Sequence, residues 1–142
     1  MRRKVVLVYR DISGEIAEET VWTEPIGNGQ YQVDNIPFFA PNLAYKDIIS
    51  IEEDENELYF KSLIEVSGHS TVQIIFFKHD KNKEHKILQE LERIGCHWEG
   101  MKGGRYYAID VPPEVDYSNV RSILKREEQR SILDFREACL AQ

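Results

Sequence analysis

The chain has 142 residues, of which 42% are hydrophobic and 30% are charged, and its formal net charge at pH 7 is −7. The composition is that of a globular protein and the length suits one domain with a hydrophobic core, so we expect a single domain over residues 1–142. The acidic balance argues against duplex nucleic acid and anionic membranes as partners, because proteins that bind them need a basic surface.

Location and thiol chemistry follow from the same overview. Only a brief apolar run, Val5 to Val8, follows the basic start of the chain, and this is too short for a signal peptide. No apolar stretch approaches the length of a membrane span. We therefore expect a cytoplasmic protein whose cysteines, Cys96 and Cys139, are reduced, buried and slow to react.

The first half of the chain, residues 1–67, has the pattern of short strands separated by turns. Gly27-Asn-Gly29 is typical of a hairpin turn, and the acidic run 52–57 joins the last two strands. Several short antiparallel strands with tight turns predict a small barrel or a strongly bent sheet. The expected strands cover residues 4–9, 19–24, 30–33, 47–51 and 58–66.

The segment VDNIPFFAPN, residues 33–42, places two adjacent phenylalanines between two prolines. Proline excludes a helix interior and a central strand, so this segment is a loop. In one interpretation Phe38 and Phe39 fold back as a plug on strand residues such as Val33 and Ile49, with at least one ring buried. In the other, the loop is the lip of a groove and exposes one ring to a ligand or peptide.

The second half, residues 68–142, mixes strands and helices. A strand (71–77), a helix (83–94) closed by Gly95 and a hairpin (96–111) precede a helix that Asp116 or Ser118 caps. Ser131 to Asp134 resembles a capping box, which predicts a short last helix carrying Phe135 and Cys139. The order strand, helix, strand, strand, helix is most of a ferredoxin-like unit. We expect an α+β fold: the bent sheet or barrel of the first half joined to a ferredoxin-like β-α-β-β-α half, with one shared core.

Sequence neighbours with reactive side chains do not form a recognisable catalytic group. Cys96 and His97 lie on one expected strand, so their side chains point to opposite faces and cannot form a dyad. His69 and Ser70, in the SGHST turn, have the same difficulty. The pattern therefore predicts no catalytic residue and favours a structural role for His69.

Metal and cofactor motifs are not recognisable either. His79, Asp80 and His85 have no second cluster to complete a zinc site, and lysines crowd the same segment. The glycine-rich run 100–105 lacks the spacing of a phosphate loop, and the acidic run 52–57 lacks the alternation of a calcium loop. We expect no cofactor and no metal, and we interpret the acidic run as a solvated turn with a possible second role in docking a basic protein.

Several segments together resemble a bacterial family catalogued as a domain of unknown function, number 4265. The resemblance spans nearly the whole chain, and its most specific parts are NIPFFA and SGHST. The family's Gly-Asp before the middle strand is Lys46-Asp47 here, so a tight glycine turn is not expected at that point. The resemblance implies a single domain and no established activity. The segments that carry it are Trp22, Tyr31, 34–40, 45–49, 67–71 and 107–112.

Two functional hypotheses follow. The first is a non-enzymatic binding protein, an immunity-type inhibitor of a basic bacterial toxin, which docks through a flat acidic face at Glu52, Glu53, Asp54 and Glu55. The alternative is a small enzyme or ligand-binding domain with a pocket beneath the NIPFFA loop. Its polar groups would be Asp34, Asn35, His69 and Ser70, with Phe38 and Phe39 at the lip. A cleft lined by these polar groups would favour the alternative.

Overall fold

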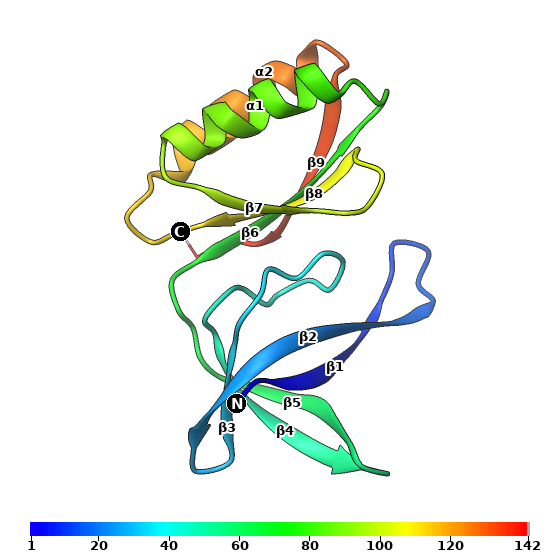
Figure 1. The fold of residues 1–142 in the computed structure, drawn as a ribbon, viewed down its shortest axis with the longest axis vertical. Helices are drawn as coiled ribbons and strands as arrows, with labels where there is room; N and C mark the ends of the chain where they lie inside the picture. Colours follow the sequence, from blue (N-terminus) through cyan, green and yellow to red (C-terminus); the bar gives the residue numbers. More distant parts are fainter. Residues whose placement is uncertain (142) are drawn as a thin grey trace.

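The structure, a computed structural model, describes residues 1–141. These residues form nine strands, arranged in two sheets, and two helices. The expected α+β class is confirmed. Figure 1 shows the strand-rich half at one end of the molecule and the half that carries both helices at the other. Among the described residues, neither helix combines the length and the apolar content that a membrane crossing requires.

The first sheet is a closed barrel whose strands follow chain order. Neighbouring strands pair antiparallel, and the barrel closes where Val6 in the first strand lies beside Tyr59 in the fifth in parallel register. Alternate residues such as Val5, Leu7 and Val21 point inward and are at most 4% exposed. The strands are β1 (Arg3–Arg10), β2 (Ile16–Gly27), β3 (Gln30–Val33), β4 (Ile48–Asp54) and β5 (Glu57–Glu65).

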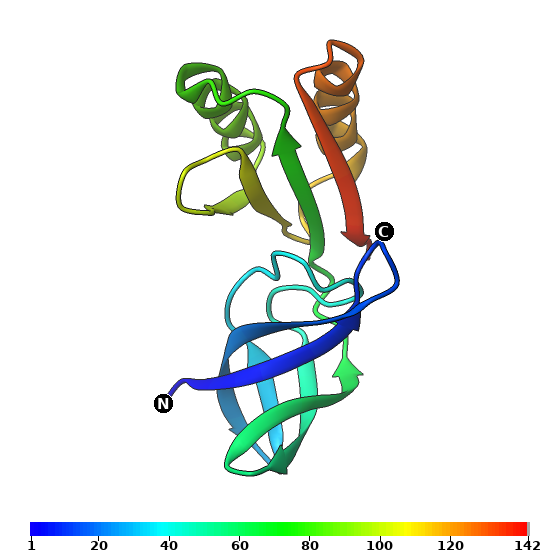
Figure 2. The same cartoon turned by 90° about the vertical axis from the view of Figure 1, so that its right-hand side faces the viewer.

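The second sheet has the strand order β7-β8-β6-β9, and all of its neighbours are antiparallel. Both helices cover one face of this sheet (Figures 1 and 2), where Ile74 and Ile109 meet helix residues such as Leu88 and Leu124. Asp80 caps the first helix and Gly95, with φ of 110°, follows its end. The elements are β6 (Ser70–Phe76), α1 (Lys81–Arg93), β7 (His97–Gly100), β8 (Tyr106–Val111), α2 (Tyr117–Gln129) and β9 (Leu133–Cys139).

The expected last helix is wrong, because residues 133–139 form strand β9. Ser131 has φ of 60° and donates its backbone N–H to the Glu128 carbonyl, so it terminates α2 instead of capping a new helix. The following residues alternate between the two faces of the sheet: Leu133 joins the helix-covered core, and Arg136 lies opposite Gln73 of β6. Pairing with β6 decides the conformation, which the capping-box pattern could not reveal.

Each half has a hydrophobic core of its own, so the expectation of one shared core is wrong. The barrel core and the helix-covered core contain no common residue. Between them runs the segment 34–47, which Figure 1 shows in cyan and turquoise between the barrel and the second sheet. Its residues Ala40 and Leu43 complete the barrel core.

The phenylalanines of this segment do not form the expected plug. Phe38 is half-buried and Phe39 is 37% exposed, and neither packs on Val33 or Ile49 as predicted. Their ring centroids lie 6.2 and 5.1 Å from that of Tyr106 in β8. The aromatic pair therefore packs on the face of the second sheet that the helices leave open.

Hydrogen bonds attach the same segment to both halves. On the barrel side, the Glu19 carboxylate accepts from the backbone N–H groups of residues 38–40 at 2.6, 3.0 and 2.9 Å. On the sheet side, Gln73 donates to the Pro37 carbonyl at 3.3 Å and the Tyr106 hydroxyl donates to the Phe38 carbonyl at 2.7 Å. The segment 34–47 thus connects the two halves. Its two ends, residues 34–36 and 45–46, line a cleft.

Candidate functional site

A cleft of about 620 Å³ lies at the junction of the two halves. The segment 34–47 forms one wall, and the strands β7 and β8 with the turn after β8 form the other. The size suits a small-molecule site. We call it the junction cleft, and it is lined by Asp34, Asn35, Ile36, Tyr45, Lys46, His69, His97, Trp98, Glu99, Asp110, Pro112, Pro113 and Glu114.

A histidine–carboxylate pair lies in this cleft. The Nδ1 atom of His69 is 2.8 Å from Oδ1 of Asp110, and the two side chains are 12% and 2% exposed. The Tyr45 ring meets the imidazole edge to face, with the centroids 5.4 Å apart. This contact and the carboxylate fix the ring orientation. With Asp110 ionised, the matching neutral tautomer has the proton on Nδ1, which leaves Nε2 as the acceptor.

Burial raises the pKa of the Asp110 carboxyl above its ordinary value, although the hydrogen bond and charge of His69 and the charges of His97 and Lys46 lower it. The ionised form of Asp110 is therefore less well compensated here than in water. A buried acid in this condition, next to a histidine in a cleft, is typical of functional sites.

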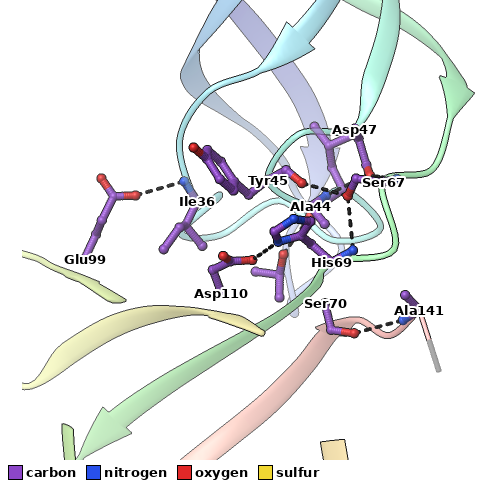
Figure 3. A network of polar contacts seen from close by, with 12 residues as sticks. Ile36, Ala44, Tyr45, Asp47, Ser67, His69, Ser70, Glu99, Asp110 and Ala141 are labelled. Carbon is purple, nitrogen blue, oxygen red and sulfur yellow. Dashed lines mark hydrogen bonds and ion pairs between the residues drawn. The ribbon is translucent and has the colours of Figure 1, made fainter. Parts of the chain in front are cut away.

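Backbone contacts place His69 in the cleft (Figure 3). The buried Asp47 carboxylate accepts from the backbone N–H groups of Ala44 and Ser67, at 2.9 and 2.8 Å. The Ser67 hydroxyl in turn donates to the Tyr45 carbonyl at 2.7 Å and accepts from the His69 N–H at 3.1 Å. One carboxylate thus couples the wall of the cleft to the turn that carries its histidine.

The backbone immediately before this histidine favours a glycine. Gly68 has φ of 89°, and a Cβ atom there would lie 3.1 Å from the side chain of Pro113. The close approach lets the chain pass from β5 into β6 while His69 faces Asp110. The physical reason for the glycine in SGHST is therefore this crowded turn.

The lip of the cleft is fixed by one contact between the two halves and by two contacts within the barrel half. Glu99 of β7 accepts from the Ile36 N–H at 2.8 Å, as Figure 3 shows. Asp34 pairs with Arg2 at 3.0 Å, and Asn35 accepts from the Trp22 N–H at 2.6 Å. The lip residues therefore already have partners, and we assign them to shaping the cleft.

The structure brings three of the four predicted polar groups together. Asp34, Asn35 and His69 line the junction cleft, whereas Ser70 does not. Ser70 is 0% exposed and its hydroxyl accepts from the Ala141 N–H at 3.0 Å (Figure 3), so its role is structural. The aromatic residues Phe38 and Phe39 lie outside the lining.

The acidic residues occupy a different place. Glu52, Glu53, Asp54 and Glu55 are all exposed at the tip of the β4–β5 hairpin, as expected for a solvated turn. Glu55 and Asn56 have φ of 48° and 69°, the left-handed backbone of a two-residue hairpin turn. They contribute no lining residue to the junction cleft.

Sequence reasoning missed several residues of the cleft, above all Asp110. A carboxylate inside the apolar strand Tyr106–Val111 was the signal that could have found it, because buried acids need a partner. His97 was considered only with Cys96. The strand separates these neighbours as expected, with Cys96 in the helix-covered core and His97 in the cleft wall.

Lys46 corrects a further expectation. Its φ is 69°, so the tight left-handed turn exists although a lysine occupies the position. Its exposed side chain extends along the cleft wall, with Nζ 5.6 Å from the centroid of the Tyr45 ring.

The other candidate groups lie elsewhere. Both cysteines are free; Cys96 is buried, and Cys139 is half-buried on β9 rather than on a helix. Burial raises the pKa of the Cys96 thiol to about 12 and also raises that of Cys139. Within residues 1–141, no group of three or more His, Cys, Asp or Glu side chains is placed to hold a metal ion.

Comparisons with known proteins give a family and a structural relative. The family model described as "Domain of unknown function (DUF4265)" matches residues 19–135. The chain is similar to a crystal structure of a hypothetical protein from Neisseria gonorrhoeae, with 35% sequence identity and a TM-score of 0.89 over 99% of this chain and 96% of that chain. No curated protein matches the chain.

Proposed function

We propose that this chain, which belongs to the DUF4265 family as its sequence predicted, binds a small polar molecule in the junction cleft. The observation that carries the proposal is the pair of His69 and the buried Asp110 in one cleft, whose lip Asp34 and Asn35 shape. The sequence predicts three of these residues, Asp34, Asn35 and His69, for such a pocket, and with Asp110 they come from three separate parts of the chain.

His69 is the group through which the cleft would act on its ligand. Asp110 orients the imidazole through Nδ1, and in that tautomer Nε2 is the atom that would accept or return a proton. The arrangement suits recognition of a ligand N–H or O–H group, and in an enzyme it would serve as a general base. The backbone contacts from Asp47 and Ser67 keep the imidazole in place without a ligand.

Thermal unfolding in the presence of a library of small metabolites tests the proposal. We expect at least one chemical class to raise the melting temperature of the wild-type chain, because a ligand that binds only the folded state stabilises it. The His69→Gln variant should lose that shift, and Glu53→Gln, on the distant hairpin tip, should keep it. A library that stabilises nothing, or a shift that survives in His69→Gln, would count against the junction cleft.

A second candidate function is protein binding, in the form of an immunity-type inhibitor of a basic toxin. It is supported by the exposed carboxylates of the β4–β5 tip, which would speed the encounter with a basic partner. Neutralising Glu52, Glu53, Asp54 and Glu55 together should slow association with such a toxin at low salt and change it little at high salt. An unchanged rate at low salt would remove the tip from the interface.

We also propose that the second half is a ferredoxin-like unit in a cytoplasmic protein. The order β6-α1-β7-β8-α2-β9 and the antiparallel strand order β7-β8-β6-β9 support the first point. Two cysteines that remain free support the second.

A further inference from the structure

We propose that the ligand of the junction cleft carries a protonated amine, which lies against the Asp110–His69 pair. This inference rests on the proposed function and adds the chemical class of the ligand. Three features of the cleft support it: the balance of charge in the lining, the state of Asp110, and the aromatic rings of the wall.

The lining is acidic. It contains four carboxylates, Asp34, Glu99, Asp110 and Glu114, against the ammonium group of Lys46. Among the described residues, only Asp34 of these four forms an ion pair with an arginine or lysine. A cleft with this balance attracts cations and repels anions, because its walls screen charge less than bulk water does.

Asp110 is the deepest of these carboxylates. Its side chain is 2% exposed, and among the described residues the hydrogen bond that it accepts comes from His69. Burial raises the pKa of Asp110 even against the opposing charges of His97 and Lys46. A ligand cation within a few ångströms would compensate the ionised carboxylate, which the protein alone does only in part.

Aromatic rings complete the wall. Tyr45 and Trp98 both line the cleft, and the ammonium group of Lys46 lies 5.6 Å from the Tyr45 centroid. The protein's own side chain thus shows that this ring accepts a cation at its face. Lys46 is exposed at the rim, so a ligand amine could take its place beside the ring.

An anionic ligand fits less well. It would need a protonated His69 or His97 together with Lys46, and it would face Glu99, Glu114 and Asp110 at close range. Like charges at such distances disfavour binding. The lining therefore selects for amines over carboxylates of the same size.

The test compares three probes of equal size: n-butylamine, n-butanol and butyrate. Each is titrated into the isotope-labelled full-length chain while the NMR signals of the Trp98 indole and the His69 and His97 imidazoles are followed. We expect butylamine to shift these signals in a saturable way and to bind at least about tenfold more tightly than butyrate, a difference typical of one well-placed charge.

Variants locate the amine. Asp110→Asn should weaken butylamine binding at least about tenfold, as expected when a buried charge partner is removed. Glu114→Gln, at the exposed rim, should weaken it by about twofold, and Lys46→Gly should strengthen it by a similar factor because a competing cation is gone. Glu53→Gln is the matched control and should bind like the wild type.

The outcomes separate this inference from the function on which it rests. If butyrate or butanol shifts the cleft signals as strongly as butylamine, the amine class is wrong while the junction cleft remains a binding site. If none of the three shifts them, the amine inference falls, and the metabolite library with His69→Gln decides the binding function independently. Should Asp110→Asn fail to fold, unchanged butylamine affinity in both Glu114→Gln and Lys46→Gly would still contradict the proposal.

Discussion

Two carboxylates, Glu84 near the start of α1 and Asp110 in the junction cleft, are equally buried, since each side chain is 2% exposed. Their surroundings differ. Glu84 accepts four hydrogen bonds, at 2.7 to 2.9 Å, whereas the contact to Asp110 comes from His69. The donors to Glu84 are the His79 ring, the backbone N–H groups of Asp80 and Arg105, and the Tyr107 hydroxyl.

The difference appears in the pKa values of the two acids. Burial raises the pKa of Glu84, but the hydrogen bonds together bring it below its ordinary value. Burial also raises the pKa of Asp110, and there the opposing contacts are too few to reverse the shift. Glu84 is therefore a fully hydrogen-bonded structural carboxylate that links α1 to the β7–β8 hairpin. The protein compensates the charge of Asp110 only in part.

The largest effect that we expect is the loss of stability when Glu84 is removed. Glu84→Ala leaves several buried donors without an acceptor, and we expect it to lower the free energy of unfolding by about 3 kcal/mol or more. Chemical denaturation of the variant and the wild type measures this. Glu90→Ala, which breaks a half-exposed pair with Arg126, is the control and should cost about 1 kcal/mol or less. Equal losses of unfolding free energy in the two variants would mean that the hydrogen bonds of Glu84 do not link α1 to the β7–β8 hairpin.

The second prediction concerns the incomplete site. Asp110→Asn keeps an oxygen that can accept from His69 and removes a poorly compensated charge. We expect the free energy of unfolding at pH 7 to stay within about 1 kcal/mol of the wild-type value or to rise, in the manner of functional residues that limit stability. A loss of unfolding free energy as large as that of Glu84→Ala would show that Asp110, like Glu84, is a structural carboxylate, and it would contradict the difference between the two acids.

Acid titration should separate the two carboxylates by sign. The folded-state pKa of Glu84 lies below 4.5, so its stabilising contribution is present above about pH 4.5 and is lost as the pH falls through the folded-state value. The folded-state pKa of Asp110 lies above 3.8, so its contribution is present below about pH 3.8 and is lost as the pH rises through the folded-state value.

Denaturation curves at pH 7 and pH 4 check these signs. Between pH 7 and pH 4, Glu84→Gln should lose less stability than the wild type, and Asp110→Asn should lose more, because the variant lacks the proton that the folded wild type gains. The same pH dependence in both variants would contradict the assignment of opposite shifts.

The contrast also explains which parts of the molecule the sequence could predict. Helix α1 was recognisable because Ile87, Leu88 and Leu91 recur at helical spacing, and the barrel because hairpin turns separate its short strands. These signals are local. Strand β9 was misread because its conformation depends on pairing with β6, whose partner residues lie 57 to 68 positions earlier in the chain.

The candidate site was predictable to the extent that its residues stand out locally. Asp34, Asn35 and His69 were predicted, because polar residues beside a proline-flanked loop and in a glycine turn form local motifs that the sequence shows directly. Asp110 was missed because its significance arises only when the fold brings it 2.8 Å from a histidine 41 positions earlier. Phe38 and Phe39 were misplaced for the same reason, since their partner Tyr106 belongs to the other half.

The smallest effect that we expect comes from Lys46→Gly. The left-handed backbone at φ 69° is unfavourable for lysine and easy for glycine, so the substitution relieves strain in the folded chain. The greater freedom of glycine in the unfolded chain offsets part of that gain, and we expect the free energy of unfolding to rise by no more than about 0.5 kcal/mol.

The Lys46→Gly change also removes a cation that lowers the pKa of Asp110, so the carboxyl should titrate at a higher pH than in the wild type. NMR titration of the Asp110 carboxyl carbon in both chains measures this. A titration midpoint that stays in place or falls would mean that Lys46 does not act on Asp110, and it would weaken the case for a cation beside that carboxylate.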